Sequence, residues 1–374
     1  MEKQWRIYRG RLERFLSKDY YPEMNLMGHL IKRKWSDGIK IEQWSPPDDQ
    51  PTPDFGAATS KHAEYTSTTV GARFGPAWTT HWFRVTLPKV TKAELKDVML
   101  HWHSEAEGLL WSNDGIPLHG LSPQDRSDVP LELISRTGEA VAIYIEMACT
   151  GLFGNGANGL IQPPDINRMY TLERCELRKY NGEAVELLTL MQILQDMINT
   201  YGDGHVDGRR ALFVANSIIN TFQAHDLSTI KSCIELAKAF LYQASSNGPM
   251  SVMAIGNCHI DTAWLWRFAE TRRKTARSWS SQLSIMQLHP KFIFAASQMQ
   301  QFDWLKRDYP ALFERITKVV EKGQFVPVGG SWVEMDGNLP CGEAFVRQFL
   351  YGQNFQKENF GAYSEIFWLP GIQK

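Results

Sequence analysis

Three patterns of hydrophobic and polar positions follow one another along the chain. Between residues 75 and 182, apolar and polar positions alternate in short runs, as in 80–87, 98–103 and 140–149, with turn-forming residues between them. Alternation with a period of two predicts strands. The stretch 112–115, Ser-Asn-Asp-Gly, is typical of a hairpin tip. Many short strands separated by turns predict a β-sandwich or jelly-roll-like domain.

The period changes to 3.6 in the next part of the chain, over residues 183–248. Apolar residues recur at helical spacing in 183–199, 209–224 and 227–243, with short polar breaks between these segments. This spacing predicts a region of three helices.

From residue 249 onward, apolar strand-like runs alternate with helical segments. Strands are predicted over 251–256, 292–296, 325–328 and 365–369, and helices over 263–287, 302–321 (with a break at Pro310) and 342–358. Strands that alternate with helices predict a parallel β/α sheet or barrel. Since the chain ends soon after the fourth predicted strand, we expect only the first half of such a domain.

The first 74 residues carry a weaker pattern. Residues 1–40 hold ten Lys/Arg and five Asp/Glu, and 45–76 are rich in Pro, Asp, Ser and Thr. We interpret them as a solvated arm and an irregular connector, with an interaction arm for an acidic partner as the alternative. The predicted fold class is therefore α+β multidomain. Its parts are an arm and connector at 1–74, a β-sandwich at 75–182, a helical region at 183–248 and an incomplete β/α domain at 249–374.

Composition excludes several classes of protein. Hydrophobic residues make up 43% of the 374 and charged residues 22%, which is an ordinary globular balance. The formal net charge of −1 gives no electrostatic reason to expect nucleic acid as a partner. No apolar run approaches the ~20 residues of a membrane span, and the N-terminus lacks the apolar core of a signal peptide. The five cysteines show no C-x-x-C spacing. These features favour a protein of a reducing compartment, the cytoplasm.

The most informative chemical motif is Gly256–Trp266, GNCHIDTAWLW, where the first predicted strand meets a helix. His259 and Asp261 are two residues apart, so on an extended backbone they project to the same side and can share one divalent cation. The carboxyl end of a parallel strand is also where such folds build their sites. The alternative is an ordinary histidine beside an aspartate that caps the next helix.

Four further features have competing interpretations. The segment 329–338, GGSWVEMDGN, is either a substrate-facing loop with two carboxylates or a solvated acidic loop. The basic run 272–274 with Arg277 is interpreted as a solvated helix face, with phosphate binding as the alternative. The tryptophans at 78, 82, 102 and 111 are interpreted as core packing, with a sugar-binding face as the alternative. The G-x-G-x-x-G match at 154–159 is interpreted as a turn, because Pro163 and Pro164 exclude the helix that a dinucleotide site needs.

Taken together, several segments resemble a known family. The stretch GNCHIDTAWLWRFAETRRK, and with it FGNGANGLIQPPDINRMYTL, GGSWVEMDGNLPCGEAFVRQFLYGQ and EIFWLP, resemble the class II α-mannosidases of glycoside hydrolase family 38, in the cytosolic and vacuolar branch of fungi and animals. The resemblance covers nearly the whole chain. It implies a retaining, zinc-dependent glycosidase built on a seven-stranded β/α barrel. The implied substrate is an α-mannoside or free oligosaccharide, and the implied location is cytoplasmic or vacuolar. Neither nucleic acid nor membrane is an implied partner, and a homo-oligomer remains open.

The resemblance also implies roles for individual residues. His259 and Asp261 match the family's first two zinc (or cobalt) ligands, and Trp264 matches an aromatic residue of the mannose site. Asp336 and Glu343 fall near the substrate loops. In the family, W-L-P is followed by an Asp that is both nucleophile and zinc ligand, but here Pro370 is followed by Gly371. No catalytic residue is therefore expected in this chain.

The chain is accordingly expected to be the N-terminal part of an α-mannosidase, with little or no turnover alone, because retaining hydrolysis needs a nucleophile and an acid/base group. Two alternatives remain. One is a non-catalytic carbohydrate-binding protein, and the other is an interaction protein that assembles with complete partners through its unpaired strand edge.

Overall fold

The structure is a computed structural model and describes residues 2–47, 52–123, 126–156, 163–245 and 251–370. It divides into two compact units. The first comprises Met1–Trp35, Lys96–Met99 and Leu177–Val252, and the second comprises Ser36–Leu95, Leu100–Glu176 and Met253–Lys374. None of the helices in the described ranges combines the length and apolar composition that a membrane crossing requires.

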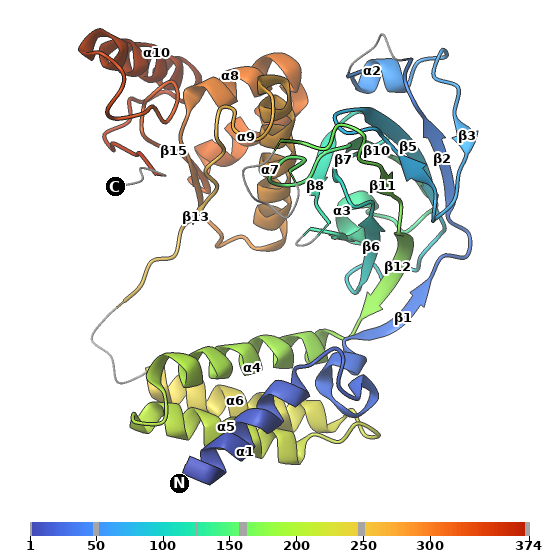
Figure 1. The fold of residues 1–374 in the computed structure, drawn as a ribbon, viewed down its shortest axis with the longest axis vertical. Coiled ribbons are helices and arrows are strands. Elements are labelled where there is room, and N and C mark those ends of the chain that lie inside the picture. The colour runs from blue at the N-terminus through green and yellow to red at the C-terminus, as the bar shows by residue number, and fades with distance from the viewer. Residues whose placement is uncertain (1, 48–51, 124–125, 157–162, 246–250, 371–374) are drawn as a thin grey trace. The chain divides into compact units, whose positions relative to one another are not determined.

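The first unit is a bundle of four helices (Figure 1): α1 (Glu2–Phe15), α4 (Gly182–Tyr201), α5 (Val206–Thr221) and α6 (Thr229–Ser245). The three helices predicted from the 3.6 period correspond to α4, α5 and α6. The first helix, α1, lies in the stretch interpreted as a solvated arm. Leu12 and Phe15 are buried in the bundle core, so a narrow apolar stripe between charged residues is enough to anchor it.

Short elements follow α1 in the same unit. Two 3-10 turns, η1 (Pro22–Met24) and η2 (Leu26–His29), lead to strand β1 (Ile31–Trp35). This strand pairs antiparallel with β12 (Arg174–Tyr180), with Trp35 opposite Leu177. The side chain of Asn25 ties the turn together, because its amide donates to the carbonyls of Arg14, Ser17 and Tyr20.

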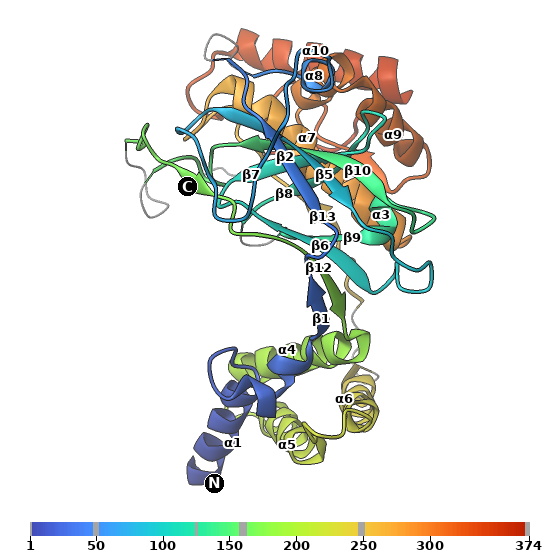
Figure 2. The ribbon, with the colours of Figure 1, turned by 90° about the vertical axis from the view of Figure 1, so that its right-hand side faces the viewer.

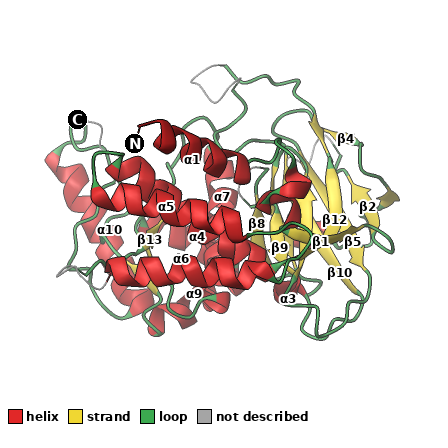
Figure 3. Cartoon of the chain, turned by 90° about the horizontal axis from the view of Figure 1, so that it is seen from below, coloured by secondary structure: helices red, strands yellow, loops and turns green. Residues whose placement is uncertain are grey.

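The second unit contains the predicted jelly roll. Its main sheet has the order β3-β2-β5-β10-β7-β8, and Figure 3 shows β5 and β10 side by side. The members are β3 (Thr66–Ser67), β2 (Lys40–Trp44), β5 (Thr80–Leu87), β10 (Val141–Ala148), β7 (Glu107–Trp111) and β8 (Pro117–Leu121). The predicted hairpin tip at 112–115 joins β7 and β8, which pair antiparallel. Strand β2 lies just before the stretch interpreted as an irregular connector, where no strand was predicted, and it pairs with β5, which is distant in the sequence.

Smaller elements complete this part of the chain: α2 (Phe55–Ala58), β4 (Arg73–Phe74), β6 (Val98–His103), β9 (Asp128–Pro130), α3 (Leu131–Ile134) and β11 (Tyr170–Thr171). The tryptophans at 82, 102 and 111 are buried, which confirms core packing for them. Trp78 is only partly buried and lies under the guanidinium of Arg267. Gly154, the first glycine of the G-x-G-x-x-G segment, forms a turn bridge with Gly151, while 157–159 lie outside the described residues.

The β/α part of the second unit begins with a parallel sheet in the order β13-β14-β15. Its strands are β13 (Gly256–Asn257), β14 (Phe294–Ala296) and β15 (Phe325–Pro327). Its helices are α7 (Phe268–Leu288), α8 (Met299–Asp308), α9 (Pro310–Glu321) and α10 (Gly342–Phe360). The predicted break at Pro310 is confirmed, since α8 ends at Asp308. These elements bear out the parallel β/α prediction.

Two predicted strands of this part are wrong. The run 251–256 contributes only its last residue to β13, and Val252 and Met253 are 83% and 84% exposed. The segment 365–369 forms no strand, and Ile366 and Phe367 are exposed. An apolar run becomes a buried strand only when neighbouring strands and helices cover it. Helix α7 also begins later than predicted, at Phe268 rather than near 263.

The jelly roll and the β/α part share one hydrophobic core. Trp82 and Tyr144 from the sheet and Trp279 and Phe302 from the helices belong to the same buried cluster. Helix α7 lies against β8, as Figure 2 shows. The contact is close at Gly120, where an added Cβ would overlap the backbone of Arg277. The N–H of Gly120 donates to Ser281 Oγ at 2.9 Å, and this bond fixes the strand to the helix.

The basic run on α7 is a solvated helix face only at Arg272, and that interpretation is wrong for its other three cations. Arg273, Lys274 and Arg277 are buried. Their partners are three buried carboxylates, of which two come from the jelly-roll sheet: Glu107 on β7, Glu146 on β10 and Glu270 on α7 itself. Burying cations is tolerable only with such paired anions. The sequence could not show this pairing because the jelly-roll carboxylates precede α7 by more than 120 residues.

Candidate active site

The carboxyl ends of β13, β14 and β15 build one site in the second unit. His259 and Asp261 follow β13, Gln298 follows β14, and Glu334 lies in the loop after β15. Residues from all three loops line a cavity of about 710 Å³. Because parallel strands bring their carboxyl ends to the same edge, three segments distant in sequence converge there.

His259 lies between two carboxylates. Its Nε2 is 2.9 Å from Asp261 Oδ1, and its Nδ1 contacts Glu334 Oε2. The hydrogen bond with Glu334 raises the pKa of His259 most, and the hydrogen bond with Asp261 raises it further. Partial burial lowers this pKa, but the two bonds outweigh it, and the pKa rises to about 9. Asp261 does not cap the following helix, because Arg267 occupies the N-cap of α7. The interpretation of Asp261 as a helix cap is therefore wrong.

Glu334 is held in place by several partners. Its side chain is buried, and it accepts hydrogen bonds from Ser297 Oγ and, at 3.2 Å, from Gln298 Nε2. It is therefore not part of a solvated acidic loop. A buried carboxylate with this many donors can fix the orientation of the imidazole beside it.

Gln298 has an unusual backbone. With φ 65° it lies in the left-handed region, which is rare for a residue other than glycine. Its side chain accepts from Thr262 Oγ1 at 3.1 Å and donates to the carbonyl of Ile260 at 2.9 Å. These bonds tie the loop that carries His259 to the start of α8.

Of the other predicted site residues that the structure describes, Asp336 lines the cavity, whereas Trp264 and Glu343 do not. Asp336 lines the cavity and is exposed, and the N–H groups of Asn338 and Leu339 hold the pKa of its carboxyl below its usual range. Trp264 does not line that cavity and is about half exposed, with its ring edge-to-face to Trp266. Glu343, in the first turn of α10, is also outside the cavity and pairs with Arg347 at 3.0 Å. Gly371 lies outside the described residues.

The geometry of His259 and Asp261 can be compared with that of a zinc site. Two ligands of a tetrahedral zinc at ~2.05 Å are about 3.3 Å apart, so the 2.9 Å separation requires only a small adjustment. The other ring nitrogen faces a carboxylate, as is usual for zinc-bound histidines. Among the described residues, however, no group of three or more His, Cys, Asp or Glu can hold a metal ion. Glu334 lies on the far side of the imidazole from Asp261, so the three groups do not converge on one point. The pair fits part of a zinc site.

Sequence reasoning missed the roles of Ser297 and Gln298 and left that of Glu334 open. The available signal was positional, because all three follow predicted parallel strands, where the same rule that pointed to His259 applies. What the sequence could not show is that Glu334, 75 residues away, contacts the His259 ring.

Comparison with known proteins supports the architecture. Residues 36–178 match the jelly-roll domain of α-mannosidases, and residues 249–371 match the N-terminal domain of glycosyl hydrolases family 38. The chain is 43% identical to alpha-mannosidase G of Dictyostelium discoideum, and the match covers 96% of this chain and 33% of that protein. It is 40% identical to human alpha-mannosidase 2C1, over 98% of this chain and 35% of that protein. The match to the alpha-mannosidase of Saccharomyces cerevisiae is 34% identical and covers 97% of this chain and 36% of that protein.

Among solved structures, the CBM51-2 and INT domains of Clostridium perfringens ZmpB align with a TM-score of 0.17 and 10% identity, over 61% of this chain and 46% of that one. That is too low to compare folds. The chain spans about one third of the length of the curated relatives it matches. The chain thus contains a region that matches the jelly-roll domain of α-mannosidases and a region that matches the N-terminal domain of glycosyl hydrolases family 38.

Proposed function

We propose that this chain provides the first zinc ligands and part of the sugar-binding surface of an α-mannosidase that acts on α-mannosides or free oligosaccharides. The observation that carries the proposal is the His259–Asp261 pair, 2.9 Å apart at the carboxyl end of β13. It lies in a chain that matches family 38 over this region. The cytoplasmic or vacuolar location expected from the resemblance belongs to the same proposal.

The residues of the cavity have separate tasks in this proposal. His259 and Asp261 hold the metal, and Glu334 orients the imidazole through Nδ1. Asp336 is exposed and ionised in the cavity, so it can accept hydrogen bonds from sugar hydroxyls. When bound, zinc supplies positive charge that orients the hydroxyls of the sugar. Trp264 and Glu343 are assigned no contact with the sugar, because neither lines the cavity.

Retaining hydrolysis also needs a nucleophile and an acid/base group. Gly371 stands where the resemblance places the nucleophile, so we expect this chain alone to bind metal and sugar but to turn over little or no substrate. Changing Gly371→Asp alone is not expected to restore turnover, because the resemblance places the acid/base group beyond that position.

The experiment measures zinc binding by titration calorimetry on the folded chain, with His259→Ala and Asp261→Ala as test variants. His225→Ala is the control, because this exposed histidine lies in the helical bundle, outside the cavity. We expect both test variants to lose zinc binding and the control to keep it. Zinc binding that survives in His259→Ala would remove the basis of the proposal.

A second measurement follows release of the chromophore from an aryl α-mannoside, beside a complete relative as the positive control. Turnover that requires metal and is lost in His259→Ala would show that the chain has a working site and that the expected inactivity is wrong. Mannoside binding that does not depend on metal would favour a carbohydrate-binding protein without catalysis.

A further inference from the structure

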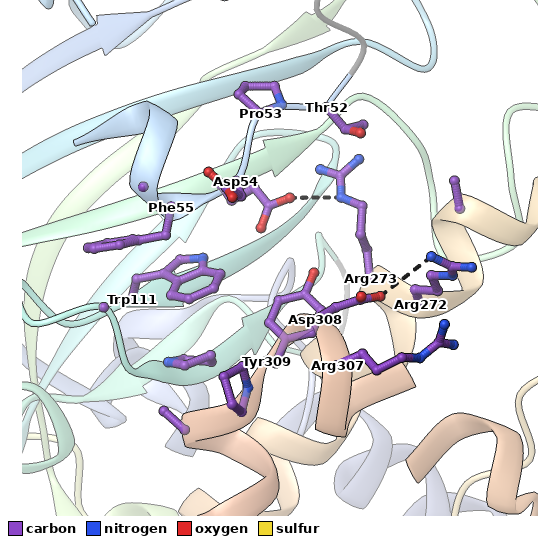
Figure 4. A pocket seen from close by; sticks show the side chains of 17 residues that line it. Thr52, Pro53, Asp54, Phe55, Trp111, Arg272, Arg273, Arg307, Asp308 and Tyr309 are labelled. Atoms are coloured by element: carbon purple, nitrogen blue, oxygen red, sulfur yellow. Dashed lines mark hydrogen bonds and ion pairs between the residues drawn. The ribbon is translucent and has the colours of Figure 1, made fainter. Parts of the chain in front are cut away.

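A second cavity lies in the same unit, between the jelly-roll sheet and the α7–α9 helices. Its volume is about 560 Å³, which is in the range of small-molecule sites. It shares no lining residue with the cavity at His259. Three arginines line it, Arg272 and Arg273 on α7 and Arg307 on α8. Figure 4 shows these side chains together with Trp111, Asp54 and Tyr309.

Two hydrogen-bond donors on its wall have no partner in the part of the chain that the structure describes. Arg273 is only 8% exposed; its Nε donates to Glu146 and its Nη1 to Glu270, but its Nη2 has no partner among the described residues. Figure 4 shows its guanidinium extending into the cavity. The indole Nε1 of buried Trp111 also has no partner within the described ranges. Buried donors without acceptors are costly, so both point to an acceptor that occupies the cavity.

The carboxylates on the wall are already engaged, in contrast to Arg273 Nη2 and Trp111 Nε1. Asp54 Oδ1 accepts the N–H of Ala57 at 2.8 Å, and Glu146 Oε1 accepts Arg273 Nε at 2.7 Å. Asp308 Oδ2 lies 3.6 Å from Arg272. The three carboxylates balance the formal charge of the three arginines, so a bound anion would be attracted by directed hydrogen bonds more than by net charge.

Trp111 does not offer a stacking surface for a sugar ring. Trp111 lies between Phe55, stacked on it at 5.1 Å, and Tyr309 at 5.8 Å, so both of its faces are occupied. Only its edge, with Nε1, remains for a ligand. This geometry favours an oxyanion over a neutral carbohydrate.

We propose that this cavity binds the phosphate group of a small phosphorylated metabolite, with Arg272, Arg273, Arg307 and Trp111 as donors. A guanidinium fork matches the oxygens of phosphate. The volume leaves room for an organic moiety attached to the phosphate. This cavity is separate from the proposed metal and sugar site, so the protein would bind a phosphorylated metabolite in addition to its sugar substrate.

The test is titration calorimetry of the full chain with inorganic phosphate, mannose 6-phosphate and mannose, at low ionic strength, where such interactions are least screened. We expect both phosphates to bind to the zinc-free chain and mannose not to bind, because the proposed sugar site at His259 needs its metal. Tighter binding of mannose 6-phosphate than of inorganic phosphate would identify a phosphorylated metabolite as the source, and equal affinity would identify free phosphate. Binding of mannose as tight as that of mannose 6-phosphate, or no binding of either phosphate, would overturn the proposal.

Variants of the proposed arginine donors test where phosphate binds. We expect Arg307→Gln and Arg272→Gln each to weaken phosphate binding about ten-fold, the typical value of one charge-assisted hydrogen bond. Arg347→Gln is the matched control, because Arg347, like Arg307, is an exposed arginine in an i, i+4 ion pair but lies on α10. Arg273→Lys, checked for folding by circular dichroism, tests the guanidinium fork itself, because lysine keeps the positive charge but lacks the forked pair of donors. Unchanged affinity in Arg272→Gln and Arg307→Gln, or an equal loss in Arg347→Gln, would place phosphate elsewhere.

Discussion

Arg277 on α7 and Glu107 on β7 form an ion pair in which both side chains are 1% exposed and Nη2 lies 3.0 Å from Oε2. The pair joins the β/α part of the second unit to the jelly-roll sheet. Arg277 also contacts Glu270, and Glu107 also contacts Lys274 at 2.5 Å. The network therefore connects two matched domains inside one shared core.

Removing one member of this network should strongly destabilise the second unit. We expect Arg277→Leu to lower the free energy of unfolding by about 3–5 kcal/mol, because it leaves buried carboxylates without their cation. Urea unfolding measures the change. Lys318→Leu is the control, since Lys318 forms an exposed ion pair with Glu314 and should change stability by about 1 kcal/mol or less. Similar losses in the two variants would contradict a special role for the buried network.

The same network predicts sensitivity to acid. Burial alone would raise the pKa of Glu270, but the charges of Arg277 and Arg273 outweigh it and hold that pKa below its usual value of 4.5. A depressed pKa in the folded state means that the stabilisation is complete above the unfolded-state pKa and is lost as the pH falls through the folded-state pKa.

We therefore expect the free energy of unfolding to fall with decreasing pH below about 4.5, and the slope to be smaller in Glu270→Gln by up to ~1.4 kcal/mol per pH unit. Urea unfolding across the acid range measures it. Glu139→Gln, at an exposed carboxylate paired with Lys89, is the control. An unchanged slope in Glu270→Gln would refute this assignment.

The close approach of β8 to α7 requires a glycine at position 120. A Cβ there would overlap the backbone of Arg277, and backbone atoms cannot move aside as a flexible side chain can. We expect Gly120→Ala to cost about 1–3 kcal/mol of stability. Gly342→Ala, at the start of α10, meets no atom within 4 Å and should be neutral or slightly stabilising. Equal stability of the two variants would mean that the sheet and helix are not packed this closely.

The contact between Glu334 and the His259 ring should affect metal binding if the proposed zinc site is present. Carboxylates that orient zinc-bound histidines typically contribute 10–100-fold to affinity. We expect Glu334→Gln to weaken zinc binding by about that factor, measured by competition with a chelator. Glu343→Gln, in an exposed ion pair outside the cavity, should leave the affinity unchanged. Equal affinities in the two variants would show that Glu334 does not orient the ligand.

The N-terminal helix should contribute to the stability of the bundle. Leu12 is buried in its core, so Leu12→Ala should cost about 2–5 kcal/mol. Ile7→Ala, on the exposed face of the same helix, should change stability by less than about 0.5 kcal/mol. Thermal unfolding followed by circular dichroism compares them. If Leu12→Ala were as stable as the wild type, residues 2–15 would be a solvated arm after all.

The sequence alone determined the elements whose pattern is local. The strands at 80–87 and 98–103, the helices of the 183–248 region and the break at Pro310 follow from periodicity and from the missing N–H of proline. It also pointed to His259 and Asp261, since a motif at the end of a parallel strand has a known place in such folds.

The tertiary structure decided what depends on partners distant in the chain. The run 251–256 has the composition of a buried strand but is largely exposed, because burial depends on what covers a segment. Arg273, Lys274 and Arg277 of the basic run on α7 are buried because carboxylates from two strands of the jelly roll reach them. Glu334 contacts His259 only because β13 and β15 end at the same edge of one sheet. Periodicity records which side of an element is apolar, whereas the identity of the groups that face each other is set only when the chain folds.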